Sequence, residues 1–301
     1  MNVYEIVTDR IVKELENGII PWNKPWIGAS YAWSRSTGKP YSLLNQLLLE
    51  DNGEYATFKQ IVSEKDGKVN KGAKAKFVTF WKMFDSKTEK DEDGNPKKIP
   101  MLRYYQVFNV AKDTNLEVKK HKELTQTFDT TPIEEVDRII DDYANRSGVR
   151  FCTDKGCDKA YYSHTDHTIH LPSIEQFKNV ALYYSTKFHE MIHSTGHKSL
   201  LNRFEKGSTS FGSDVYSKEE LVAEIGTACI LNRLGIETDD SFRNSTAYVQ
   251  NWAKHIKADN KMIVSASSKA EKAVQLIFGE VEAREESDST ETSVESAMSV
   301  A

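Results

Sequence analysis

The sequence predicts an α+β protein of two domains: a small α+β domain, then a mostly helical domain with a small sheet. Its 301 residues suffice for two domains of ordinary size. Runs of aromatic and branched residues typical of strands lie within residues 77–110, whereas helical spacing of apolar residues dominates beyond residue 132. Residues 1–122 hold 21 Lys and Arg against 16 Asp and Glu, and the rest hold 19 against 29. This asymmetry indicates two functions on one chain.

Local patterns place five elements in the first domain, assigned to residues 1–122. Apolar residues recur at helical spacing from Tyr4 to Leu15, and Gly18 ends this helix. The Pro- and Trp-rich segment 20–26 cannot be helical throughout. Two short helices and two strands are predicted at 41–49, 58–64, 77–84 and 101–110. The polar segment Asp85–Pro100 between the strands is expected to form the tip of a long hairpin.

The second domain, assigned to residues 133–282, follows a polar linker at 123–132. Its predicted elements are an amphipathic helix, a strand pair and three further helical regions, at 133–144, 159–172, 177–196, 217–234 and 247–277. The tail at 283–301 is acidic, rich in Ser and Thr and nearly without large apolar residues. We expect this tail to be disordered.

Composition excludes several classes of protein. Three cysteines are too few for a disulfide framework. No apolar run approaches the ~20 residues that a membrane helix needs. The N-terminus is charged and amphipathic and lacks the apolar stretch of a secretory signal. We therefore expect a cytoplasmic protein without membrane contact.

The sharpest chemical signal is the pentapeptide His189-Glu190-Met191-Ile192-His193. Residues four apart share one face of a helix, with Cβ atoms ~5–6 Å apart, so both imidazoles can ligate one Zn²⁺. Glu190 would then accept a proton from the metal-bound water and pass it to a leaving amine. Mn²⁺ or Co²⁺ could occupy a similar site. Taken alone, the pentapeptide also fits a surface helix with two solvated histidines.

A third protein ligand is expected from a second helix, because a catalytic zinc site has three protein ligands and one open position. Glu220 and Glu224 are four residues apart and share one face of the helix predicted at 217–234. In one arrangement Glu220 ligates the metal and Glu224 orients His193. In the other, Glu220 completes a capping box with Ser217 and Glu224 becomes the ligand. We favour Glu220.

Other histidines and cysteines are weaker candidates for metal ligands. His197 comes soon after the pentapeptide, and only a sharp turn at Gly196 would bring it to the metal. Cys152 and Cys157 favour a turn with two free thiols. Three histidines of the strand pair are expected on one solvated sheet face: His164, His167 and His170.

Basic and aromatic residues interleave in the first domain. Single-stranded nucleic acid is held by cationic grooves and by aromatic rings on which bases stack. The candidate contacts are Trp22, Lys24, Trp26, Lys39, Tyr41, Lys71, Lys74, Lys76 and Trp81. The alternative is that the aromatic residues build the core of a small domain while the lysines keep it soluble.

Several further motifs span the chain from Tyr4 to Phe278. The N-terminal motifs are 18–26, 37–45, 57–60 and 71–74. The C-terminal motifs are 160–162, 169–172, 189–197, 201–203, 211–213 and 219–226. With these motifs in this order, the chain resembles the ArdC-type antirestriction proteins of conjugative plasmids and phages. Asn45 belongs to the second N-terminal motif and completes the candidate nucleic-acid contacts.

The resemblance implies an N-terminal single-stranded-DNA-binding domain and a C-terminal zincin-like metallopeptidase domain. It further implies a protein that protects incoming unmodified DNA from host restriction, with a host restriction-system protein as candidate substrate. Other zincins with a Glu ligand carry E-x-x-A-[DE], ligand first, which residues 220–224 match and which supports Glu220. Two alternatives stay open: a non-catalytic binding module with a structural metal, and a metallopeptidase whose N-terminal domain is a protein adaptor.

Overall fold

The computed structural model describes residues 2–17, 20–22, 32–49, 51–90, 94–119, 132–154, 159–204, 214–236 and 246–281. Two compact units divide these residues, and each combines helices with a sheet, which confirms the α+β class. The division falls inside α1 (Val3–Glu16), because Thr8 and the residues that follow up to Trp22 group with the second unit. The sequence analysis had placed this whole helix in the first domain, and the domain bounds stay predictions.

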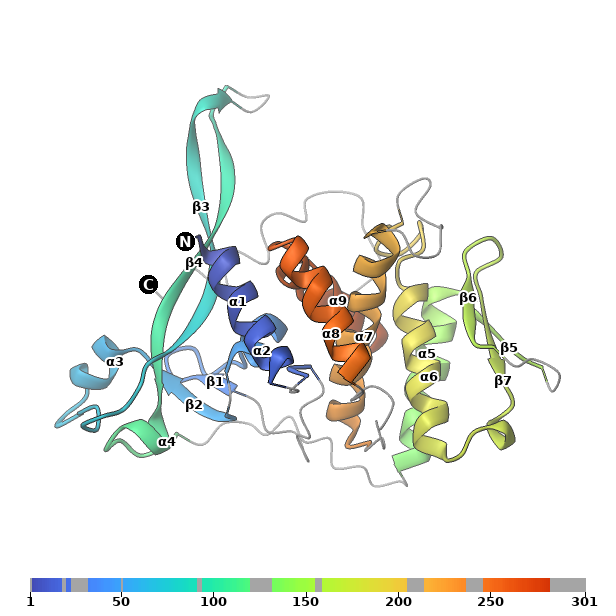
Figure 1. Cartoon of the computed structure of the whole chain (residues 1–301), viewed down its shortest axis with the longest axis horizontal. Coiled ribbons are helices and arrows are strands. Elements are labelled where there is room, and N and C mark those ends of the chain that lie inside the picture. The colour runs from blue at the N-terminus through green and yellow to red at the C-terminus, as the bar shows by residue number, and fades with distance from the viewer. Residues whose placement is uncertain are drawn as a thin grey trace. The chain divides into compact units, whose positions relative to one another are not determined.

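The first unit contains a four-stranded sheet (Figure 1). Its strands lie in the order β1 (Ala32–Ser34), β2 (Gly53–Ala56), β4 (Pro96–Asn109) and β3 (Lys76–Lys90). The first two are parallel, and the other neighbours are antiparallel. Only the end of β4 pairs with β2, at Tyr55–Asn109 and Ala56–Phe108. Most of the β3–β4 hairpin therefore extends beyond the shorter strands.

Three short helices complete the first unit: α2 (Leu43–Leu48), α3 (Phe58–Ser63) and α4 (Val110–Asp113). The first two match the predicted helices. A capping box of Thr57 and Gln60 fixes the start of α3. The core of this unit is a cluster of buried side chains from the sheet and from the end of α2: Ala32, Leu49, Tyr55, Val78 and Val107.

The hairpin strands are longer than the sequence patterns indicated. Most of the segment Asp85–Pro100, expected as a polar tip, belongs to β3 and β4. Asp85 is paired with Lys98, and Glu89 lies 3.0 Å from Lys97. Opposite charges on neighbouring strands stabilise a sheet. The charged sequence therefore extends the ribbon instead of interrupting it.

The second unit is mostly helical with one small sheet, as predicted. The sheet has the order β5 (Arg150–Asp154), β7 (Thr168–Pro172) and β6 (Tyr161–Ser163). β5 runs parallel to β7, and β6 runs antiparallel to it. The helices after residue 131 are α5 (Pro132–Ser147), α6 (Val180–Ser194), α7 (Asp214–Leu234), α8 (Thr246–Ala258) and α9 (Met262–Ile277). Among the described residues, no helix has the length and apolar character that a bilayer-spanning segment needs.

Two helices of the second unit begin three residues away from their predicted starts. α6 begins at Val180 instead of residue 177, because the side chain of Asn179 accepts the backbone N–H of Leu182 and a 3₁₀ turn precedes it. α7 begins at Asp214, before the predicted start at Ser217.

Several expectations fall outside the described residues. They concern Gly18, Lys24, Trp26 and Cys157, the acidic tail at 283–301 and the linker at 123–132, of which only Pro132 is described, as the first residue of α5. These expectations stay predictions.

Candidate metal centre

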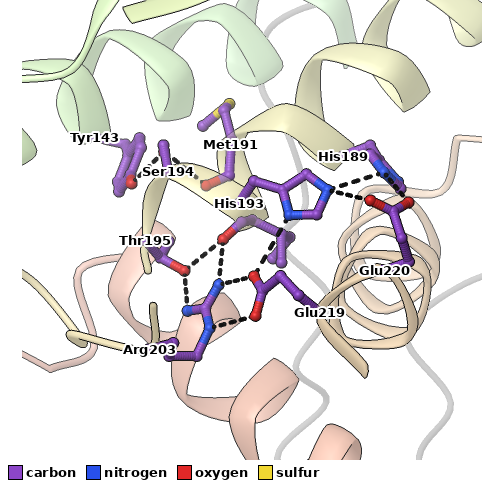
Figure 2. Close-up of polar contacts among 10 residues, drawn as sticks. Tyr143, His189, Met191, His193, Ser194, Thr195, Arg203, Glu219 and Glu220 are labelled. Atoms are coloured by element: carbon purple, nitrogen blue, oxygen red, sulfur yellow. Dashed lines mark hydrogen bonds and ion pairs between the residues drawn. The ribbon is translucent and has the colours of Figure 1, made fainter. Parts of the chain in front are cut away.

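The two histidines of the pentapeptide lie one turn apart on α6 and converge on one point (Figure 2). Their Nε2 atoms are 3.2 Å apart. The opposite side of the helix holds it in place, because Phe188, Met191 and Ile192 are fully buried. Burying each such side chain contributes ~1.5–3 kcal/mol relative to exposure. The core therefore directs both imidazoles to the other side of α6.

Glu220 on α7 completes the group. Its Oε2 lies 3.4 Å from Nε2 of His189, and its Oε1 lies 3.3 Å from Nε2 of His193. One donor atom from each of the three residues lies within 4.8 Å of the others. Ser217 lies inside α7, so the capping-box interpretation of Glu220 is wrong.

Close contact between α6 and α7 lets Glu220 reach the histidines. A Cβ atom placed on Gly226 would lie 2.7 Å from Cδ1 of Ile192, closer than real Cβ contacts. A larger residue here would force the Ile192 side chain or the helices to shift, so glycine allows this close packing. Gly226 lies in the C-terminal motif 219–226 of the sequence.

A carboxylate that the sequence analysis did not single out contacts the other nitrogen of His193. Oε1 of Glu219 lies 3.4 Å from Nδ1 of His193. The arrangement favoured from the sequence gives this orienting position to Glu224. Metal-ligating histidines usually donate their second N–H to a carboxylate, which fixes the ring orientation. Glu219 can take this role, and no local sequence signal separates it from the other charged residues of α7.

Arg203 holds Glu219 and the end of α6 together (Figure 2). Its guanidinium donates to Oε1 and Oε2 of Glu219 at 2.6 and 3.2 Å. It also donates to Oγ1 of Thr195 at 2.6 Å and to the carbonyl oxygen of Ile192 at 2.8 Å. The side chain is only 4% exposed. A buried guanidinium with this many partners fixes the geometry around His193.

A second anchor comes from α5. The hydroxyl of Tyr143 lies 2.8 Å from Oγ of Ser194, which donates to the carbonyl oxygen of Met191 at 2.7 Å. Tyr143 is fully buried, and this burial raises its pKa to about 12. The C-terminal turn of α6, which carries His193, is therefore held from both α5 and Arg203.

Opposite charges face one another in the metal-free site. Burial by itself lowers the pKa of His193, but hydrogen bonds to Glu219 and Glu220 outweigh it and raise this pKa to about 10. Burial raises the pKa of Glu219, but His193 and Arg203 outweigh it and lower this pKa to about 2. Against the same effect of burial, His189 and His193 lower the pKa of Glu220. The site thus holds two carboxylates against cationic partners.

The donor set fits a divalent metal ion. Tetrahedral ligands ~2.0–2.1 Å from an ion lie roughly 3.3 Å from one another. The Nε2 atoms of His189 and His193 are 3.2 Å apart, and each lies 3.3 or 3.4 Å from a different carboxylate oxygen of Glu220. Two imidazoles and one carboxylate suit Zn²⁺ and also accept Mn²⁺. Glu190 is buried on the same helix and lies close enough to His193 to raise its pKa.

The other histidines have different contacts. The ring of His197 stacks on that of His167 at 4.1 Å, and its Nδ1 lies 2.7 Å from Oγ of Ser199. His164 packs edge-on against Phe204. Only His170 lies within a strand, β7, so the three histidines of the strand pair do not share one sheet face. Among the described residues, the group that could hold a metal is His189, His193 and Glu220.

Two predicted nucleic-acid contacts are core residues. Trp22 is 4% exposed and packs edge-to-face on Trp252 within the second unit, at 6.3 Å between ring centroids. Asn45 is buried and bonds both backbone groups of Thr79, at 2.7 and 2.8 Å. Neither side chain is available to a ligand in this structure, so both expectations are corrected to structural roles.

The remaining described candidates differ in exposure. Tyr41 packs against the core of the first unit, and Trp81 is half-buried with Tyr4 at 6.5 Å. Lys76 lies 3.4 Å from Asp51. Three lysines are exposed: Lys39, Lys71 and Lys74. Exposure alone leaves these lysines as predicted contacts.

Comparison with known proteins gives the class to which this fold and site belong. A family model of the zincin-like metallopeptidase domain matches residues 137–269, which include His189, His193 and Glu220. A model of the N-terminal domain of the anti-restriction factor ArdC matches residues 1–108. The chain thus joins a zincin-like domain to an ArdC-type N-terminal domain.

The full-length comparison identifies the family. The metal-free crystal structure of the antirestriction protein ArdC from plasmid R388 is 32% identical, with a TM-score of 0.69 over 92% of this chain and 97% of that one. Its Mn(II)-bound structure matches with a TM-score of 0.70 over 93% and 98% of the two chains. The chain therefore belongs to the ArdC antirestriction protein family, as the sequence motifs indicated.

Relatives of other lengths share the same region. DNA primase TraC of Escherichia coli is 30% identical over 318 residues, which cover 98% of this chain but 29% of TraC. The chain thus spans less than a third of this relative. Protein y4eC of Sinorhizobium fredii is 27% identical, over 90% of this chain and 89% of its own length.

Proposed function

We propose that this chain protects incoming DNA from restriction by binding single strands with its first unit and hydrolysing peptide bonds with its second. The observation that carries the peptidase half is the convergence of two imidazoles and one carboxylate, with one donor atom of each within 4.8 Å of the others. Membership of the ArdC family and the R388 protein's printed description support the antirestriction role. The site of action is the cytoplasm, where incoming DNA meets restriction enzymes.

The bound metal is Zn²⁺ in this proposal, with Mn²⁺ as the alternative that the Mn(II)-bound relative supports. Such an ion polarises a peptide carbonyl and lowers the pKa of water. His189, His193 and Glu220 hold it. Glu190 takes the proton of the attacking water on its carboxylate and delivers it to the amine nitrogen that leaves.

Two further residues keep the proposed metal ligand His193 oriented. Glu219 holds Nδ1 of His193, so that Nε2 points to the metal position. Arg203 holds Glu219 in turn. The proposed substrate is a protein of the host restriction system.

The experiment is Glu190→Gln, which preserves the size of a buried side chain while removing the base. We expect unchanged metal binding, with cleavage of a host-cell extract or a peptide library at least ~100-fold slower. Transfer of unmodified DNA into a restricting host then measures protection. If Glu190→Gln protects as well as wild type, peptidase activity is dispensable for protection and the chain protects DNA as a binding module.

The alternative of a protein adaptor in the first unit makes a different prediction. Under that alternative the full chain fails to bind single-stranded oligonucleotides at low salt, while peptidase activity persists. Under our proposal, it binds them with an affinity that falls as salt rises.

A further inference from the structure

The outer part of the β3–β4 hairpin extends past the rest of its sheet (Figure 1). Beyond its base, no described strand pairs with it, since β2 meets only Phe108 and Asn109 of β4. A two-stranded ribbon on its own is marginally stable in water. The outer part of the hairpin adds little to the core of the first unit, so we examine whether its side chains form a binding surface.

One face of this ribbon is defined by alternation and register. Residues i and i+2 of a strand share a face, which places Phe80, Lys82 and Phe84 together. Their directly opposite partners on β4 are Arg103, Met101 and Ile99. We call these six residues the outer hairpin face. The same face continues inward to Val78, which is fully buried in the core.

The outer hairpin face exposes large apolar side chains beside two cations. Ile99 is 40% exposed and Met101 is 43% exposed. The Nζ of Lys82 and the Cζ of Arg103 lie 5.4 and 5.3 Å from the ring centroid of Phe84. Cations at such distances from a ring are held by its quadrupole. Ring, guanidinium and ammonium therefore form one preassembled group.

The six residues of this face carry two positive charges and no negative charge. The carboxylates of Asp85 and Glu89 on the same hairpin form ion pairs with other lysines, Lys98 and Lys97. Within the described part of the chain, Lys82 and Arg103 have no carboxylate partner. Two such cations complement the charge of a phosphate backbone.

We infer that the outer hairpin face binds single-stranded DNA, with phosphates on Lys82 and Arg103 and bases against Phe84, Met101 and Ile99. This inference rests on the proposed function and names the surface that performs its DNA-binding half. Apolar surface beside cations suits unpaired bases, which offer a π-face, whereas the π-faces of bases in a duplex are covered by stacking and only their edges are reached from the grooves. The guanidinium of Arg103 adds a plane on which a base can stack.

The test compares two charge-matched double variants of the full chain. Lys82→Ala with Arg103→Ala removes the unpaired cations, and Lys97→Ala with Lys98→Ala removes two paired cations of the same hairpin. Binding of a labelled oligo-dT strand is followed by fluorescence anisotropy at several salt concentrations. All four positions are exposed, and circular dichroism checks that each variant is folded.

For the first variant we expect binding at least ~10-fold weaker at low salt. The slope of log affinity against log salt should become shallower by ~1.4, because each contact to a single strand contributes ~0.7. The control variant should retain the wild-type slope. Phe84→Leu, which keeps an apolar side chain without a ring, should weaken binding about fivefold or more if a base stacks there.

Two results would overturn the inference. If wild type binds the strand and Lys82→Ala with Arg103→Ala binds it with the same affinity and slope, DNA lies elsewhere on the first unit and the proposed function stands. If wild type binds duplex and single strand equally and Phe84→Leu has no effect, the face is not a single-strand site. Failure of wild type to bind at all would instead remove the DNA-binding half of the proposed function.

Discussion

The guanidinium of Arg203 donates two hydrogen bonds to the carboxylate of Glu219, at 2.6 and 3.2 Å. Oε1 of that carboxylate lies 3.4 Å from Nδ1 of His193. Arg203 also bonds the carbonyl oxygen of Ile192 near the end of α6. It therefore connects this backbone to Glu219 on α7, the carboxylate that orients the imidazole of His193. The ring of His193 is thus positioned before any metal arrives, and the site is preorganised.

Replacing Arg203 should weaken metal binding. Arg203→Ala leaves buried Glu219 with His193 but without its guanidinium partner, which should destabilise the fold by about 3–5 kcal/mol and lower metal affinity roughly 10- to 100-fold. Arg203→Lys keeps the charge but loses the pair of hydrogen bonds to Glu219, so we expect an intermediate metal affinity. Metal titration and urea unfolding measure both effects. Arg150→Ala, at an exposed arginine of the same unit, is the control, and equal metal affinity in Arg203→Ala and wild type would refute this role.

The contact between Gly226 and Ile192 makes a prediction about helix packing. Gly226→Ala should cost ~1–3 kcal/mol through overpacking and should weaken metal binding, because Glu220 moves with α7. Ile192→Val removes Cδ1, the atom nearest the new methyl group. The double variant should therefore be more stable than the sum of the single changes indicates. If the changes in the free energy of unfolding measured in urea are simply additive, the contact between residues 192 and 226 does not set the separation of the helices.

Metal binding should release a proton from His193. Its pKa of about 10 in the metal-free protein means that the ring is protonated at pH 8, whereas a metal ligand must be neutral. The ion competes with this proton at every pH below 10, so apparent affinity should rise with pH between 7 and 9. Calorimetry in buffers of different ionisation enthalpy should count about one proton from this group at pH 8. No proton release would mean that His193 is already neutral.

Asn45 should prove structural. Asn45→Ala leaves the backbone N–H and carbonyl of Thr79 without their side-chain partner, which should cost about 1–3 kcal/mol in urea unfolding. Under conditions where the variant is folded, we expect its oligonucleotide affinity to equal that of wild type. A loss of binding without a loss of stability would restore Asn45 as a DNA contact.

Local geometry explains what the sequence could predict. His189 and His193 converge because a helix places residues four apart on one face. The same spacing on a second helix offers Glu220 and Glu224 as the third ligand, and the resemblance to other zincins favours Glu220. Glu219 and Arg203 were missed because their contact depends on how the turn after α6 packs against α7, which no local pattern encodes.

The misassigned residues have physical causes as well. Composition cannot distinguish a core tryptophan from a stacking platform, so Trp22 was expected to face DNA although it packs on Trp252. The charged segment Asp85–Pro100 looked like a loop because its ion pairs exist only once the strand register is known. The outer hairpin face could not be predicted from the sequence for the same reason, because only the strand register places its β3 residues beside its β4 residues.

The most direct test of the metal centre is a comparison of Glu220→Gln with Glu224→Gln. Metal content after dialysis and affinity by calorimetry should show one ion per chain in wild type and in Glu224→Gln, with Glu220→Gln weakened at least ~100-fold. Both variants change one carboxylate of α7 by a single atom, so each serves as the control for the other. If Glu224→Gln loses the ion and Glu220→Gln keeps it, the ligand set proposed here is wrong.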